Sequence, residues 1–194
     1  MMMNLSRVLI GLLVFWSAAW AASQKPIYRN QQYGILLPVP PGALPCMPPI
    51  YMGSGADHGV QMLLGTDDAT LCSKSTGKRY MDVWASYTVT DEEKTLHGYL
   101  ESECEIDVQR KCSSAPEGLQ INGLKTEAGR LDHSDGSIEI ILVTQAGKPD
   151  PDFDASVPAI SYSLSLITDK QHLKQDLTAF RAMLKAIRIA PKGK

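Results

Sequence analysis

Residues 160–189 constrain the fold of this chain most, because their apolar pattern changes from a period of two to a period near 3.6. Apolar and serine residues alternate from Ile160 to Leu166, which predicts a strand with one apolar face. The helix predicted to follow carries one apolar stripe, spaced by four, three, four and three residues: Leu173, Leu177, Phe180, Leu184 and Ile187. A strand followed by such a helix is typical of a helix packed on a sheet.

A similar order occurs earlier, where an alternating strand over 81–89 leads into a helix carrying Leu96, Tyr99 and Leu100. Each helix is preceded by a predicted capping box, in which a threonine hydroxyl and a later Glu or Gln satisfy the first free backbone amides. The boxes are Thr90-Asp91-Glu92-Glu93 and Thr168-Asp169-Lys170-Gln171. Both strand–helix units are therefore interpreted as structural frame.

Two turn signals predict an antiparallel meander between these units. Asn122-Gly123 and Asp135-Gly136 are typical of two-residue hairpins, whose central positions need positive φ. Residues 33–39 and 60–64 add two short strands before the meander. The predicted fold class is α+β, an antiparallel β-sheet flanked by helices.

The first residues, 1–21, have the pattern of a cleavable secretory signal peptide. Arg7 supplies a positive start, Val8 to Trp16 form a short apolar run, and Ala19-Trp20-Ala21 is an A-x-A cleavage signal. An uncleaved anchor is the alternative, but a spanning helix needs about 20 apolar residues. We expect a single domain over 22–194, in the periplasm or secreted, with no stable membrane insertion after cleavage.

The charge balance disfavours nucleic acid as a partner. The chain of 194 residues has a formal net charge of −2, and removal of Arg7 with the leader makes it −3. No basic stripe or basic amphipathic helix is present to track a phosphate backbone or an anionic membrane surface.

Four cysteines, an even number in a chain predicted to be exported, indicate disulfides. Three pairings are possible; we favour Cys104–Cys112 around a polar turn, which leaves Cys46–Cys72 between two loop segments. A zinc site is the alternative, but the spacings contain no CxxC and no histidine at ligand spacing. We expect no metal and no cofactor.

Two segments resemble the Mog1/PsbP-like α/β/α sandwich superfamily. They are YGILLPVPPGA at 33–43 and YSLSLITDKQHLKQDLTAFRAMLKAIRI at 162–189. In that superfamily an early strand leads into a proline-glycine turn, and a last strand leads into a long helix with a hydrophobic-basic end. The resemblance implies the sandwich fold, which the predicted disulfides would brace in this chain, and a mostly non-catalytic role in binding or assembly. It supplies no site residue, and the disulfides depart from its usual pattern.

No set of catalytic residues is evident. There is no G-x-S-x-G elbow, and Ser54 in GSGADHG lacks a strand-to-helix context. Asp57 and His58, taken with Asp67 or Asp68, form the best hydrolase set that can be assembled. The acidic loop PDPDFD at 149–154 lacks the glycine and glutamate of a calcium-binding EF-hand loop. The chain is therefore predicted not to be an enzyme.

An acidic cluster around Cys104 is the main candidate contact surface. The speculative partner-binding residues are Asp57, His58, Glu101, Glu103, Glu105 and Asp107. A solvated helix end is the simplest interpretation; recognition of a basic partner is the sharper one.

The leading functional hypothesis is an exported, non-catalytic periplasmic binding protein. In class, although not in any motif, the chain is similar to periplasmic immunity proteins that neutralise antibacterial effectors of type VI secretion. The expected partner is accordingly a protein, with a secreted toxin or effector as the narrower hypothesis. The alternatives are a small exported hydrolase and an envelope assembly or accessory protein.

Overall fold

The computed structural model describes residues 27–46, 58–73, 79–87, 95–105, 111–147 and 160–190. Its elements, in chain order, are β1 (Ile27–Asn30), β2 (Ile35–Pro38), β3 (Ala43–Cys46), β4 (Gly59–Leu64), the 3₁₀ helix η2 (Ala69–Ser73), β5 (Tyr80–Tyr87), α1 (Leu96–Cys104), β6 (Ser113–Ser114), β7 (Thr126–Asp132), β8 (Ser137–Ala146), β9 (Ile160–Asp169), α2 (Leu173–Ala186) and β10 (Arg188–Ile189).

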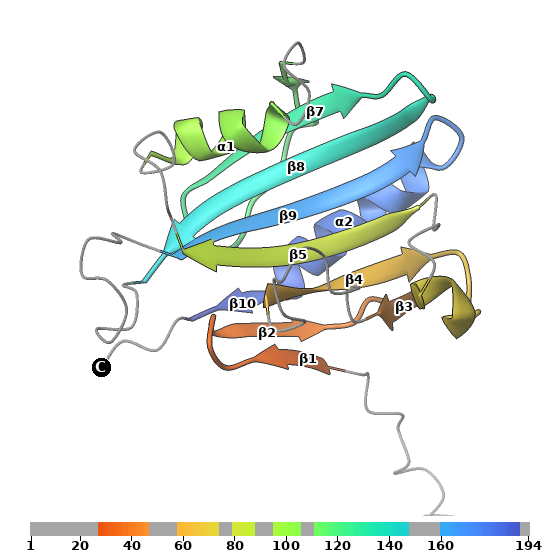
Figure 1. Cartoon of the computed structure of the whole chain (residues 1–194), viewed down its shortest axis with the longest axis horizontal. Helices are drawn as coiled ribbons and strands as arrows, with labels where there is room; N and C mark the ends of the chain where they lie inside the picture. Colours follow the sequence, from red (N-terminus) through yellow and green to blue (C-terminus); the bar gives the residue numbers. More distant parts are fainter. Residues whose placement is uncertain are drawn as a thin grey trace, which may run out of the picture.

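A seven-stranded antiparallel sheet forms the centre of the molecule, in the order β3-β4-β5-β9-β8-β7-β6. Helix α1 lies over β7 and β8 on one face, and α2 crosses behind β9 on the other (Figure 1). A smaller antiparallel sheet, β1-β2-β10, packs beside α2. The predicted α+β class, an antiparallel sheet flanked by helices, is confirmed.

The alternation in β9 separates the two faces of the large sheet. Tyr162, Leu164 and Leu166 point toward α2 and are fully buried in the larger core cluster. Ser161, Ser163 and Ser165 point to the α1 side, and these serines are also buried. Because β9 is the middle strand, both of its faces are covered, and the serine face must find hydrogen-bond partners.

The α2 face holds the larger core. Phe180, Met183 and Leu184 of α2 are buried against the sheet, together with Ile187 at the helix end. Tyr33, in the turn before β2, and Ile35 and Leu37 of β2 join the same core, and the Tyr162 hydroxyl donates to the Tyr33 carbonyl at 2.7 Å. The chain after α2 then pairs with β2 as β10, which the sequence pattern did not predict.

The two predicted helix caps are wrong in position. Helix α1 begins at Leu96, and its N-cap is Thr95, whose hydroxyl accepts from the Gly98 amide at 3.0 Å. Residues 88–94, which include the Thr90 box, lie outside the described residues. Strand β9 continues to Asp169, so α2 begins only at Leu173 and has no side-chain N-cap.

The two predicted hairpins have different outcomes. The Asp135-Gly136 turn joins β7 and β8 as predicted, with Gly136 at φ 87°. Around Asn122-Gly123 there is a turn but no flanking strands. Ile121 is instead buried in the larger core, which anchors this segment to the domain.

The proline-rich segment after β2 contains a strand that the sequence did not predict. The segment after the early strand was predicted as a proline-rich surface turn, yet Ala43–Cys46 forms β3. This strand is at the edge of the sheet, with no partner on its outer side among the described strands. Pro45 has no amide hydrogen to donate, and an edge strand tolerates this because only one of its sides is paired.

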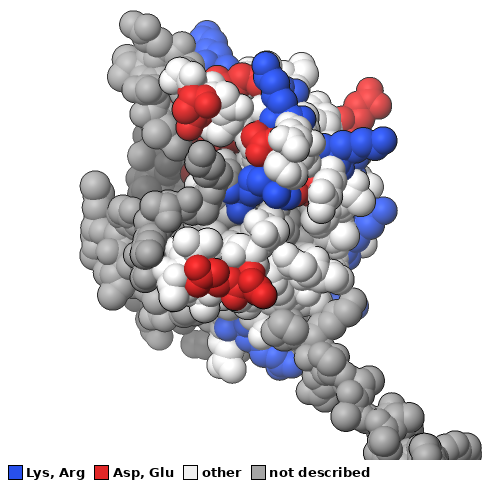
Figure 2. Space-filling model, turned by 90° about the vertical axis from the view of Figure 1, so that its right-hand side faces the viewer, with Lys and Arg blue, Asp and Glu red and all other residues white. Residues whose placement is uncertain are grey.

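The surface carries both signs of charge. On the face that Figure 2 shows, basic and acidic side chains are interspersed, and neither sign forms a continuous field. This distribution agrees with the small net charge of the chain. On this face, charge-based recognition would rest on a local group of side chains.

Candidate functional site

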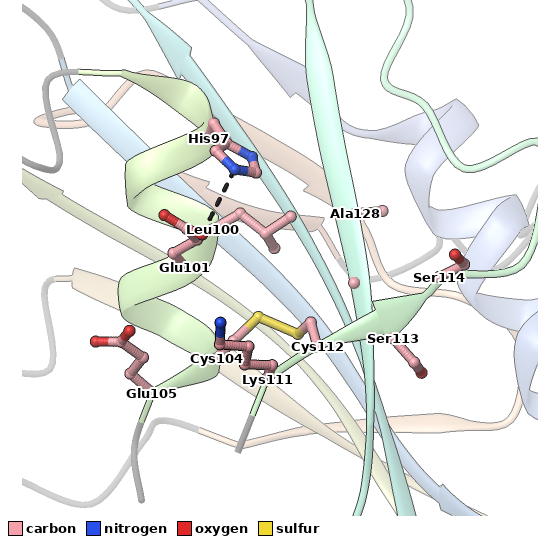
Figure 3. A pocket seen from close by; sticks show the side chains of 11 residues that line it. His97, Leu100, Glu101, Cys104, Glu105, Lys111, Cys112, Ser113, Ser114 and Ala128 are labelled. Carbon is pink, nitrogen blue, oxygen red and sulfur yellow. Dashed lines mark ion pairs between the residues drawn. A yellow bond between two sulfur atoms is a disulfide. The ribbon is translucent and has the colours of Figure 1, made fainter. Parts of the chain in front are cut away.

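A pocket of about 320 Å³ lies between α1 and the β6–β7 edge of the large sheet (Figure 3). The helix supplies one wall, the two edge strands supply the other, and a disulfide crosses the floor. The lining residues are His97, Leu100, Glu101, Cys104, Glu105, Lys111, Cys112, Ser113, Ser114, Ala128 and Gly129.

The packing of α1 determines which of its side chains face this pocket. Leu96, Tyr99, Leu100 and Cys104 form the buried side of the helix, against apolar side chains of β7 and β8. Residues four apart lie on one face of a helix. The exposed wall of the pocket is therefore built from His97, Glu101 and Glu105, each four residues from the next.

The Cys104–Cys112 disulfide fixes the distance between the two walls. It links the last residue of α1 to the residue before β6, with 5.6 Å between their Cα atoms. Strand β7 makes room for it with a glycine, because a Cβ on Gly129 would lie 2.5 Å from the Cys112 Sγ. Thus Gly129, which no turn requires, is explained by the disulfide that crosses it.

The rim of the pocket is predominantly acidic. The His97 ring lies between two carboxylates, with Nδ1 3.1 Å from Glu127 Oε2 and Nε2 3.5 Å from Glu101 Oε1. Glu105 is exposed at the end of α1, and Lys111 is the one lysine or arginine among the lining residues. The floor, by contrast, is apolar: Leu100, Gly129 and the disulfide.

The structure divides the predicted acidic cluster in two. Glu101 and Glu105 face the pocket, but Glu103 faces the middle of the sheet and accepts from the Ser163 hydroxyl at 2.8 Å. The reason is helical geometry, because a residue two positions away lies about 200° around the axis. Asp107 and Asp57, the other acidic candidates, lie outside the described residues.

His58 lies far from these residues along the chain, at the start of β4, and is held by its surroundings. Its Nδ1 is 2.9 Å from the Tyr33 hydroxyl and 2.9 Å from the Ala85 carbonyl oxygen. Its ring stacks on Trp84 with 5.2 Å between centroids. These contacts account for His58 as a packing residue at the end of the sheet.

The hydrolase set built on His58 does not assemble. Asp67 and Asp68 follow the far end of β4, and six strand residues at about 3.3 Å each separate them from His58 by roughly 20 Å. Asp68 is used locally, because it accepts from the Thr70 amide and hydroxyl.

A polar cluster that the sequence analysis missed lies beneath the inner side of α1. The Ser165 hydroxyl donates to Asp82 Oδ1 at 2.6 Å across the β5–β9 pair. Burial raises the pKa of the Asp82 carboxyl to about 6; the Ser165 hydrogen bonds oppose this rise, and the charges of Glu139 and Glu103 add to it. The signal was present, because Asp82 and the serines occupy the polar positions of two alternating strands.

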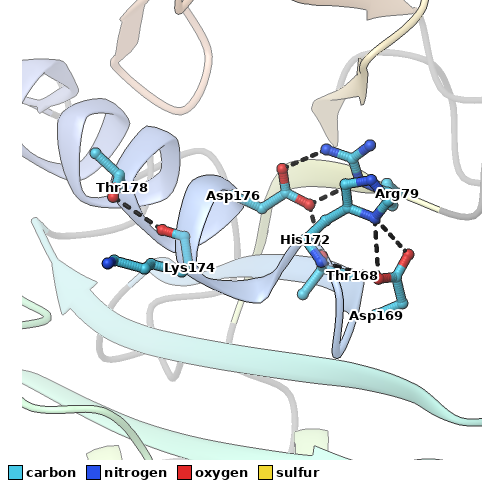
Figure 4. Close-up of polar contacts among 7 residues, drawn as sticks. All are labelled: Arg79, Thr168, Asp169, His172, Lys174, Asp176 and Thr178. Carbon is cyan, nitrogen blue, oxygen red and sulfur yellow. Dashed lines mark hydrogen bonds and ion pairs between the residues drawn. The ribbon is translucent and has the colours of Figure 1, made fainter.

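A second buried polar group lies on the α2 side (Figure 4). Asp176, only 2% exposed, forms two hydrogen bonds with the Arg79 guanidinium, at 2.6 and 2.8 Å. The Thr168 hydroxyl, predicted as a helix cap, donates to the same carboxylate at 2.5 Å. The bond with Asp176 raises the pKa of Arg79. This group fastens α2 to β5 and β9 and lies away from the pocket.

The described residues contain neither a cluster of metal-ligating side chains nor a membrane-spanning helix. No group of three or more His, Cys, Asp or Glu side chains in this part of the chain is arranged to hold a metal ion. Neither described helix is long and apolar enough to cross a membrane. The predicted leader over 1–21 and the acidic loop at 149–154 lie outside the described residues.

The predicted cysteine pairing is confirmed. Cys46 is bonded to Cys72 and Cys104 to Cys112, and no free cysteine is found. Disulfides form and persist in oxidising compartments, so both bonds are compatible with an extracytoplasmic location. They also brace two loop regions, one at each edge of the large sheet.

Comparison with known proteins gives a distant structural likeness alone. No protein-family model matches the chain, and no curated protein matches it. Among solved structures, it is similar to the solution structure of cyanobacterial PsbP (CyanoP) from Synechocystis sp. PCC 6803. The sequence identity is 10%, the match covers 85% of this chain and 92% of that chain, and the TM-score is 0.40. At this score we draw no conclusion about function from the likeness.

Proposed function

We propose that this chain is an exported binding protein that contacts a partner protein through the α1–β6 pocket. The observation that carries the proposal is the pocket itself: an open site with an acidic rim and an apolar floor, whose walls are joined by a disulfide. A preformed site loses less conformational entropy on binding than a loose one, which favours tight association.

The composition of the pocket supports protein binding over the catalytic alternative. Its carboxylates, Glu101 and Glu105, are exposed to solvent, whereas catalytic carboxylates generally lie partly buried beside charged neighbours. An acidic rim over an apolar floor is instead suited to recognition of a basic, amphipathic side chain.

The narrower proposal is that the partner is a secreted antibacterial effector, which this protein neutralises. Its support is the class of protein: a predicted leader, two disulfides and a small braced α+β domain, in the described residues of which no catalytic set assembles. An envelope accessory protein would share all of these features. The two are distinguished by what the partner does, and the same experiment reports on both.

The test is an affinity capture with the oxidised mature chain as bait, repeated with two double variants of matched charge change. Glu101→Lys/Glu105→Lys reverses the pocket rim, and Asp67→Lys/Glu117→Lys makes the same change at exposed positions outside the pocket. We expect a stoichiometric partner that is retained by the wild type and the control and lost by the rim variant. A partner retained equally by all three baits would contradict the pocket as the binding site.

The captured protein then separates the two narrower roles. If periplasmic expression of the partner arrests growth and co-expression of this chain restores it, the protein is an immunity protein. If the partner is harmless and its assembly or abundance depends on this chain, the accessory role is supported.

A further inference from the structure

We infer that the pocket accepts an arginine side chain from an extended segment of the partner, and that this segment lies along the outer edge of β6. The inference rests on the proposed function and adds the chemistry of the contact. It follows from three features of the described residues: the floor of the pocket, the charges on its rim, and the unpaired edge beside it.

The floor matches the stem of a long basic side chain. Leu100, Gly129 and the two sulfur atoms present an apolar surface between α1 and β7. The aliphatic part of arginine or lysine packs on such a surface while the charged head stays near water. A pocket of about 320 Å³ is large enough to hold one such side chain and its ordered water.

The rim favours a cation, and it favours a planar one. Glu101 and Glu105 lie one helical turn apart, and Glu127 lies beside them through its contact with His97. Three carboxylates therefore outnumber Lys111. A guanidinium has five N–H donors in a fixed plane and can address two carboxylates at once, whereas an ammonium acts as a point charge.

The edge beside the pocket gives the partner backbone a place to bind. Strand β6 is the last strand of the large sheet, and it pairs only with β7 among the described elements. Ser113 and Ser114 are both exposed and line the pocket. An extended peptide can add to such an edge through main-chain hydrogen bonds, and its alternate side chains then point toward α1.

A different ligand class would use the same pocket in another way. Lys111, with His97 when protonated, would attract an anion, which the carboxylates on the same rim would repel. The short length of β6 is also what proteins use to discourage edge pairing. Each of these alternatives predicts a distinct outcome in the experiment below.

The experiment is an NMR titration of the oxidised, isotope-labelled mature chain with capped pentapeptides, Thr-Val-X-Val-Thr. X is arginine, lysine or citrulline, the last being the neutral analogue of arginine with nearly the same shape. We expect shift changes at 97–105, 111–114 and 127–129 with the arginine peptide. We expect the citrulline peptide to bind about fivefold more weakly than the arginine peptide. High salt should weaken the binding of the arginine peptide, because it screens the attraction between the guanidinium and the carboxylates.

Protein variants localise the effect. Glu101→Gln/Glu105→Gln should reduce the affinity for the arginine peptide to that for the citrulline peptide, and Asp67→Asn/Glu117→Asn should not. An arginine peptide with N-methylated backbone amides should bind more weakly than its parent. Equal binding of the N-methylated peptide would overturn the edge-pairing part of the inference.

The outcomes also separate this inference from the proposed function. Equal affinity for arginine and citrulline, shift changes elsewhere, or no binding of the arginine peptide would overturn the inference. If the captured partner nevertheless depended on Glu101 and Glu105, the proposed function would stand. A stronger response to inorganic phosphate than to the arginine peptide would replace the cationic ligand with an anionic one.

Discussion

The two helices are attached to the same sheet by different means. Helix α2 lies over the larger core, and a buried ion pair between Asp176 and Arg79 fastens its first turn. Helix α1 covers a smaller cluster over β7 and β8, and a disulfide at its last residue fastens it to the edge. One attachment is a buried interaction within the core, and the other is a covalent bond at the surface.

This difference indicates a division of labour. On the α2 side, the helix and β2 bury the apolar side chains of the larger core. The α1 side leaves a pocket, because the disulfide holds the helix and the edge strand together without filling the space between them. Changes on the α2 side should therefore affect the stability of the whole domain, and changes around α1 should act locally.

The largest expected effect is loss of the buried carboxylate on the α2 side. Asp176→Ala leaves the Arg79 charge without its partner, and breaking a buried pair in this way costs about 3–5 kcal/mol. The measurement is urea unfolding followed by circular dichroism. Asp169→Ala, at an exposed carboxylate near the same helix start, serves as the control and should cost far less. If both variants lost the same stability, the buried pair would not be the main attachment of α2.

The next effect concerns Asp82 beneath α1 and depends on pH. Its folded pKa of about 6 lies above the ordinary value of 3.8, so the folded state holds a proton that the unfolded state has already released. Stability from this group is present below pH 4 and is lost as the pH rises through 6. The full shift amounts to about 3 kcal/mol.

The check on Asp82 is a pH series of unfolding free energies for the wild type and Asp82→Asn. Carboxylates whose pKa is lowered, such as Asp132 and Asp169, give the opposite slope in both proteins and cancel in the difference. The wild type should lose stability relative to the variant between pH 4 and 7. A difference that stays constant over that range would contradict the raised pKa.

The third effect is removal of the disulfide that holds α1. The cysteines are eight residues apart, for which chain entropy predicts a loss of about 2.6 kcal/mol in Cys104→Ala/Cys112→Ala. Hydrogen exchange should show faster opening of α1 and β6, with protection of β9 and α2 little changed. A uniform loss of protection across the sheet would show that α1 is not a separate local unit.

The smallest effect is expected at the N-terminal cap of α1. Thr95→Ala removes the hydroxyl that accepts from the Gly98 amide, at a cost of about 1 kcal/mol. Fraying should be confined to the first turn of α1, as measured by amide exchange at Gly98 and its neighbours. Thr178→Ala, at an exposed site within α2, should leave the amides of α1 unchanged and so provides the control.

Much of the frame could be predicted from local pattern. The alternation in β9, the Asp135-Gly136 hairpin and the cysteine pairing depend on residues close in sequence or on a small number of combinations. The positions of the helix starts could not be predicted in the same way. Thr168 precedes α2, as a helix cap should. Its hydroxyl nevertheless donates to the buried carboxylate of Asp176, eight residues later, and does not cap the helix.

The candidate site was predictable only in part. The sequence shows one acidic run, formed by Glu101, Glu103 and Glu105. In the folded helix, Glu103 points toward Ser163, whereas the other two carboxylates lie on the pocket rim. The contributions of Gly129, Ser113 and Ser114 had no local signal, because they come from strands that only the folded sheet brings beside α1. Asp82 occupies a polar position of an alternating strand, but its contact with Ser165 could not be predicted locally, because the two residues are 83 positions apart.

The sequence by itself determined the α+β class and favoured one of three cysteine pairings, because periodicity and spacing are local properties of the chain. Only the tertiary structure decided that Asp176 is buried with Arg79, that β10 joins β2, and that the α1–β6 space remains open as a pocket. These features depend on contacts between distant segments. Their stability comes from burial and charge pairing that no single segment contains.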